Sequence, residues 1–89
     1  MKRVLVPLND FDEREIDALH QSLMDMGNEI VRNLSRAEAE REPAFPRPEP
    51  AVILEVPEEM SLGWVKRMVA HALTHLKTHA YQGEPITLG

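Results

Sequence analysis

Three evenly spaced histidines are the residues of this chain best suited to chemistry. His71, His75 and His79 follow one another at intervals of four residues in a segment expected to be helical. Each interval advances about 40° around a helix and about 6 Å along it, so neighbouring imidazoles can face the same point. Paired helical histidines of this kind bind divalent metals such as zinc, nickel or copper. The spacing therefore predicts a metal site formed by His71, His75 and His79.

The histidine segment lacks parts of the known metalloprotease pattern. No glutamate directly follows His71, and a further ligand would have to come from His20 or from a carboxylate that folds close to the helix. A second interpretation is that these histidines lie along the half-buried border of a helix, where they fill space or contact a partner. Both interpretations stay open, and the sequence indicates no cofactor other than such a metal.

Two aspartates form a second candidate site. Asp10 and Asp12 follow an expected strand, and paired carboxylates at a strand end can hold Mg²⁺ for phosphoryl chemistry. However, Asp10 with Glu13, or Asp12 with Glu15, also has the spacing of a capping box, which explains the acids structurally. The chain has no Gly-rich phosphate loop and no recognisable nucleophile, base and acid set. A metal-dependent protein or hydrolase that uses Asp10 and Asp12, or the three histidines, is the alternative function.

The composition describes a small chain that folds without covalent cross-links. Its 89 residues predict one domain over 1–89, with 43% hydrophobic and 28% charged residues. The chain contains no cysteine, which excludes disulfides, thiolate metal sites and thiol nucleophiles. The longest apolar runs are much shorter than the roughly 20 residues that cross a bilayer, and no signal-peptide core follows the basic start. We therefore expect a soluble, cytoplasmic protein without membrane contact.

The charge is unevenly distributed along the chain. The net charge is −5, yet residues 60–89 carry three basic groups against Glu84 alone. An acidic surface argues against nucleic acid as the partner, because phosphate binding needs clustered Lys and Arg. A third class of function, nucleic-acid binding through the last helix, would need Lys66, Arg67 and Lys77 to line one surface.

Apolar periodicity and helix-ending residues divide the chain into its expected elements. Short β-branched runs predict strands at residues 3–8, 29–34, 51–56 and 86–88, and intervals of three and four predict helices after Asp12 and after Ser61. The first helix uses Ile16, Leu19, Leu23 and Met26, and the second uses Leu62, Val65, Val69, Ala72, Leu73, Leu76 and Ala80 and ends near Gly83. A short helical turn is expected at about 36–41. Residues 42–50 hold four of the seven prolines and predict an extended, exposed loop.

The boundary at Gly27 decides the topology. Gly27 and Asn28 tolerate the left-handed conformation that ends a helix, which favours a strand at 29–34. The competing prediction continues the first helix toward Pro43, at a cost of about 1 kcal/mol for the internal glycine. With the strand, the order is β-α-β-β-α-β, and the fold class is α+β: a two-layer, ferredoxin-like sandwich with a four-stranded sheet and two helices on one face.

The two most apolar strands point apolar side chains to both faces of the expected sheet. Helices on one face would leave the other face open, and the simplest cover is a second copy of the chain. We therefore expect a homodimer through the open sheet face, with Val4, Val6, Val52 and Leu54 as contact residues.

Two aromatic residues are further candidates for partner contact. Phe45 lies in the Pro-rich loop, where it is either tucked onto the sheet or used as an anchor for a partner. Trp64, near the start of the second helix, is a core or interface residue. From these observations we expect a small, acidic, non-enzymatic binding or regulatory module that acts through protein–protein contacts, both with itself and with a further protein.

Overall fold

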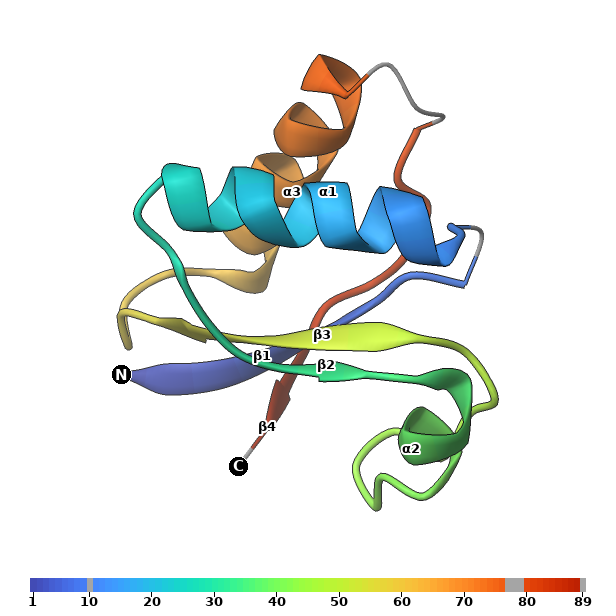
Figure 1. The fold of residues 1–89 in the computed structure, drawn as a ribbon. Helices are drawn as coiled ribbons and strands as arrows, with labels where there is room; N and C mark the ends of the chain where they lie inside the picture. Colours follow the sequence, from blue (N-terminus) through green and yellow to red (C-terminus); the bar gives the residue numbers. More distant parts are fainter. Residues whose placement is uncertain (10, 77–79, 89) are drawn as a thin grey trace.

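The computed structural model describes residues 1–9, 11–76 and 80–88, and in these residues a four-stranded antiparallel sheet is combined with three helices (Figure 1). The elements in chain order are β1 (Lys2–Pro7), α1 (Glu13–Asp25), β2 (Glu29–Leu34), α2 (Arg36–Glu40), β3 (Ala51–Val56), α3 (Leu62–His75) and β4 (Ile86–Leu88). The α+β class is confirmed. The element order differs from the predicted β-α-β-β-α-β because α2 forms a helix of its own between β2 and β3.

The sheet has the strand order β2-β3-β1-β4, with every neighbouring pair antiparallel. The two most apolar strands, β1 and β3, therefore lie at its centre, where both of their faces can be covered. Their register pairs Val4 with Leu54 and Val6 with Val52. Because opposite residues of an antiparallel pair point to the same face, these four side chains share one side of the sheet.

The end of α1 settles the alternative at Gly27. Gly27 has a φ of +86°, the left-handed conformation that a side chain disfavours. The Asn28 backbone N–H and its side-chain amide both donate to the Leu23 carbonyl, which satisfies one of the free acceptors at the helix end. The chain then enters β2 as predicted, so the prediction of a helix running on toward Pro43 is wrong.

The larger core lies between the sheet and the pair of helices α1 and α3. Figure 1 shows both helices on the same side of the sheet. The side chains that fill this layer are apolar residues from all three sources: Val4, Val6, Val52, Leu54 and Val56 from the sheet, Leu19 and Leu23 from α1, and Val65, Val69, Ala72 and Leu73 from α3. Helical spacing of three and four therefore predicted most of the buried residues of both helices. Met26 is an exception, because it is the C-cap of α1 and is 47% exposed.

A second, smaller core covers the opposite face of the sheet. Leu5 and Ile53, which point away from α1 and α3, pack with Phe45 of the Pro-rich loop and Ala39 of α2. Phe45 is only 3% exposed, although most of its neighbours in the loop are exposed. The chain thus covers this face itself. The expectation of an open sheet face is corrected, because the segment between β2 and β3 folds back over it.

Helix α3 is shorter than predicted. It ends at His75 with Leu76 as its C-cap, and Ala80 is not helical. Tyr81 is buried in the larger core, so the chain has already turned back toward the sheet at this point. Within the described ranges, no helix has both the length and the apolar character needed to cross a membrane.

Candidate functional site

The predicted sheet contacts are core residues. Val4, Val6, Val52 and Leu54 have no exposed surface and pack beneath α1 and α3. A partner that docks on the folded chain cannot reach them. Their assignment as contact residues is therefore corrected. Phe45 is buried against the sheet. Of the two predictions for this residue, the one that made it an anchor for a partner is therefore wrong.

Trp64 is the predicted contact residue that the fold leaves at the surface. It lies in the first turn of α3 and is 56% exposed. Its position is fixed by the cap of the helix, where the Trp64 backbone N–H donates to Ser61 Oγ at 3.1 Å. Its side chain borders a shallow depression together with Pro57, Glu59 and Met60. Ser61 completes the lining of this depression, and we call its five residues the Trp64 surface: Pro57, Glu59, Met60, Ser61 and Trp64.

Exposed charged residues precede and follow Trp64 in the chain. Glu58 and Glu59 precede it in the β3–α3 connection and are exposed, and Glu58 Oε1 lies 3.3 Å from the amino terminus of Met1. Arg67 follows Trp64 by about one helical turn and is also exposed. The Trp64 surface therefore combines apolar side chains with Glu59, and Arg67 is the next exposed basic residue along α3.

The structure brings two of the three predicted metal ligands together. The His71 and His75 rings are stacked, with centroids 6.2 Å apart and an angle of 23° between the ring planes. Both side chains are exposed, and they line a small hollow with Ser22, Asp25 and Met26 at the end of α1. His79 lies outside the described residues. In that part of the chain, no three His, Asp or Glu side chains already converge on a point where a metal could bind.

Asp12 has a structural role at the start of α1. Its carboxylate accepts from the Glu15 backbone N–H at 2.9 Å, and Glu15 Oε1 accepts from the Asp12 N–H at 3.1 Å. This reciprocal pair is the predicted capping box. Asp10, the other half of the proposed Mg²⁺ pair, lies outside the described residues.

A groove begins beside this cap. It has a volume of about 580 Å³ and is lined by α1 residues such as Ile16 and Asp17 and, across from them, by Asn33, Ser35 and Arg36. The α1 wall of the groove holds carboxylates, and the opposite wall holds both Arg36 and Glu38. Among the described residues of this groove, the Ser35 hydroxyl donates to Glu38 Oε1 at 3.2 Å, and this pair belongs to the cap of α2.

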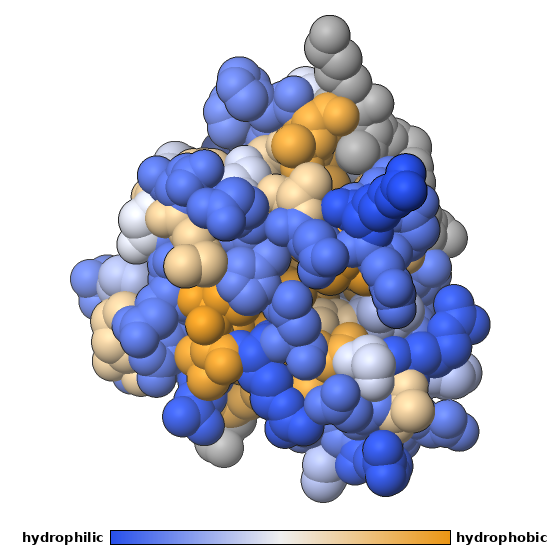
Figure 2. Space-filling view, in the orientation of Figure 1, coloured by the Kyte–Doolittle hydropathy of each residue, from blue (hydrophilic) through white to orange (hydrophobic). Residues whose placement is uncertain are grey.

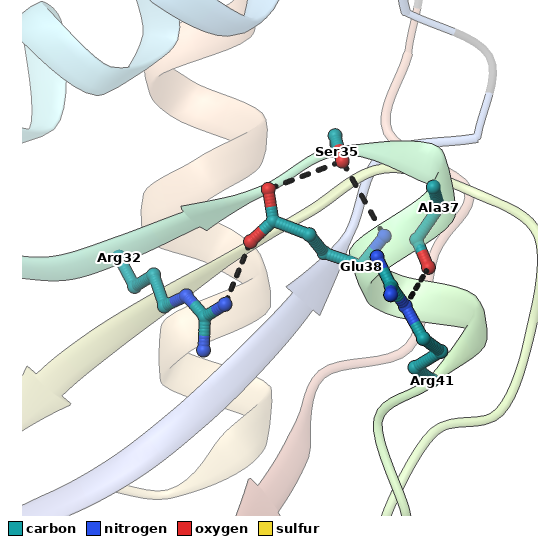
Figure 3. Close-up of polar contacts among 5 residues, drawn as sticks. All are labelled: Arg32, Ser35, Ala37, Glu38 and Arg41. Carbon is teal, nitrogen blue, oxygen red and sulfur yellow. Dashed lines mark hydrogen bonds and ion pairs between the residues drawn. The ribbon is translucent and has the colours of Figure 1, made fainter.

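A polar network holds α2 against the sheet at the other side of this groove (Figure 3). Arg32 of β2 donates to Glu38 Oε2 at 2.7 Å, and Ser35, the N-cap of α2, accepts from the Glu38 backbone N–H. The Ser35 hydroxyl also donates to Glu38 Oε1 at 3.2 Å. The hydrogen bond from Arg32, followed by this one from Ser35, lowers the pKa of Glu38 below its ordinary value. The charged form of Glu38 thus stabilises α2, and this contribution is lost as the pH falls through the lowered pKa. The network explains these charged residues as supports of the fold.

A second group of exposed apolar side chains lies elsewhere, where α1 passes into β2. Figure 2 shows apolar atoms gathered over this connection, with polar side chains over most of the rest of the view. Met24, Met26 and Val31 are 49%, 47% and 40% exposed. The β2 edge carries a register shift between Ile30 and Arg32, and such a bulge hinders pairing with a further strand. We therefore regard this edge as protected.

Sequence reasoning missed the place of Asp25. The spacing of the histidines showed that a further ligand had to come from elsewhere, and His20 was one candidate. Instead, His20 Nδ1 lies 2.8 Å from Asn33 Oδ1 on the far side of α1, whereas Asp25 borders the histidine hollow. The way α1 packs against α3 places Asp25 rather than His20 at the hollow. The packing of two helices cannot be predicted from neighbouring residues in the sequence.

No protein-family model, no curated protein and no solved structure matches this chain. The candidate functions therefore rest on the chain's own residues.

Proposed function

We propose that this protein is a non-enzymatic binding module that acts through protein–protein contacts and pairs with a second copy of itself through the Trp64 surface. The exposed Trp64 carries this proposal. Tryptophan is among the residue types most enriched at the energetic centres of interfaces, because it combines a large apolar area with little loss of side-chain freedom. An indole that is 56% exposed and stands beside Pro57 and Met60 gives a centre of this kind.

Charge complementarity supports a second copy as the partner. A two-fold axis near Trp64 would bring the acidic side of one copy, at Glu58 and Glu59, opposite Arg67 of the other. The symmetry repeats this contact, so two such ion pairs would flank one pair of tryptophans. Rim charges of this kind select the partner and its orientation more than they add affinity.

We also propose a fold type and a cellular location for this protein. We propose that the fold is the ferredoxin-like arrangement with α2 as an insertion between β2 and β3, which the strand order β2-β3-β1-β4 supports. We further propose that the protein is cytoplasmic and has a regulatory role. Cell fractionation of the tagged protein tests the location.

Sedimentation velocity over a range of protein concentrations tests the pairing. We expect the wild-type chain to shift from monomer to dimer as concentration rises, and Trp64→Ala to remain monomeric. The matched control is Met24→Ala, which truncates an apolar side chain of similar exposure on α1 and leaves the dimer intact. Since Trp64 is the only tryptophan, its emission should also move to shorter wavelength as the dimer forms.

A charge exchange tests the proposed orientation. Arg67→Glu should weaken the dimer by placing like charges opposite each other, and adding Glu59→Lys to it should restore pairing. A wild-type chain that stays monomeric at several hundred micromolar, or a Trp64→Ala chain that pairs as well as wild type, would refute the proposal.

A further inference from the structure

We infer that His71, His75 and Asp25 form a binding site for one divalent transition metal between the ends of α1 and α3. This site goes beyond the proposed protein contacts and lies within a single chain. It also differs from the site predicted by histidine spacing alone, because its carboxylate comes from a different helix.

The two stacked histidines must turn their ring nitrogens toward a common point to chelate a metal. Two imidazoles bound to one metal through nitrogens at about 2.0–2.1 Å have ring centroids about 5 Å apart. The observed separation of the centroids is 6.2 Å, so the rings need to approach by about 1 Å. Both rings are exposed, and exposed side chains rotate within nanoseconds without disturbing the backbone. Side-chain rotation can therefore bring the two imidazoles together on one metal.

Asp25 gives the hollow a negative charge on its other wall. It is the last residue of α1, and one of its oxygens accepts from Gln21 Nε2 at 3.0 Å. The last turn of α1 contains no basic residue, although the carboxyl end of a helix carries a partial negative charge. A cation beside Asp25 would interact favourably with both the carboxylate and the helix end.

The set of donors fits a particular class of metal. Two imidazole nitrogens with one carboxylate favour zinc, copper or nickel over magnesium or calcium, which prefer oxygen ligands. The hollow is open to solvent, so water would complete the coordination. Such a bound metal would tie the carboxyl end of α1 to α3, and metal binding should raise the stability of the folded chain.

Isothermal titration of the untagged protein with zinc or nickel chloride tests this site. We expect one metal per chain, loss of that binding in His71→Ala and in His75→Ala, and affinity at least about tenfold weaker in Asp25→Asn. His20→Ala is the matched control, since His20 pairs with Asn33 away from the hollow, and it should bind as wild type does.

Two further variants separate this site from other sources of binding. His79→Ala should retain the binding; if it abolishes binding and Asp25→Asn does not, the assignment of Asp25 is overturned. Trp64→Ala should also bind one metal per chain. Binding that disappears in that variant would show a metal held between two copies and would refute the site within one chain. Unchanged binding in both His71→Ala and His75→Ala would refute the site entirely.

Discussion

Replacing Phe45 with alanine tests the claim that the Pro-rich loop seals the second face of the sheet. The Phe45 ring is 3% exposed and packs with Leu5 and Ile53, and Arg47 lies over it at 5.2 Å from the ring centroid. Truncating a buried phenylalanine to alanine costs about 3–5 kcal/mol in free energy of unfolding. Because the neighbouring loop residues are exposed and can move into the space, we expect the free energy of unfolding to fall by about 3 kcal/mol.

That loss is large for a chain of this size. The free energy of unfolding of small domains is about 5–15 kcal/mol, and 1 kcal/mol shifts the melting temperature by about 4–8 °C. We therefore expect the melting temperature of Phe45→Ala to fall by about 12–24 °C when thermal unfolding is followed by circular dichroism. We also expect stronger binding of a dye that reports exposed apolar surface, because Leu5 and Ile53 lose their cover.

Two comparison variants isolate the effect of the aromatic ring. Phe45→Leu keeps an apolar cover and should lose less than half as much stability. Pro46→Ala changes an exposed neighbour in the same loop and should cost no more than about 1 kcal/mol. If the free energy of unfolding of Phe45→Ala is within about 0.5 kcal/mol of wild type and the variant binds no additional dye, Phe45 does not seal this face of the sheet.

Three further substitutions test the local structure by chemical denaturation. Asp12→Ala should lower the free energy of unfolding by about 1 kcal/mol through loss of the α1 cap. Asp17→Ala, at an exposed position in the same helix, should change it little, and equal losses in the two variants would contradict the role of Asp12 as a cap. The Tyr81 hydroxyl is buried and has no hydrogen-bond partner among the described residues, so Tyr81→Phe should leave the free energy of unfolding unchanged or raise it by about 1 kcal/mol. A clear loss of stability would reveal a partner. An added methyl at Gly83 would lie 2.5 Å from the Tyr81 hydroxyl oxygen, so Gly83→Ala should lower the free energy of unfolding by about 1–3 kcal/mol. Gly63→Ala is the control, because the nearest atom there is 3.9 Å away and alanine should be tolerated.

Local signals in the sequence were sufficient for most element boundaries. Asp12 and Ser61 begin their helices because a side-chain oxygen there accepts a backbone N–H that the helix itself leaves free. Gly27 ends α1 because the left-handed conformation has little cost without a side chain. Each of these effects acts within four residues, so the sequence alone reports it. The end of α3 was placed too late because the burial of Tyr81 in the core depends on contacts with distant segments.

The contact surfaces could not be predicted in the same way. Apolar side chains on both faces of β1 and β3 showed correctly that both faces needed cover, but not which segment would supply it. The cover for Leu5 and Ile53 is Phe45, which reaches them only because the loop after α2 folds back across the sheet. A loop that returns and a second copy of the chain bury the same surface, so an apolar pattern cannot distinguish them.

The sequence by itself determined the α+β class, the main strands and helices, the acidic charge and the histidine spacing, because each depends on composition or on neighbours a few residues apart. The tertiary structure alone decided that Val4 and Leu54 are sealed in the core, that Trp64 is at the surface, and that Asp25 stands beside His71. The physical reason is that exposure and the meeting of side chains depend on how segments distant in sequence pack together. Periodicity shows which face of an element is apolar, and the packing of the whole chain decides what that face meets.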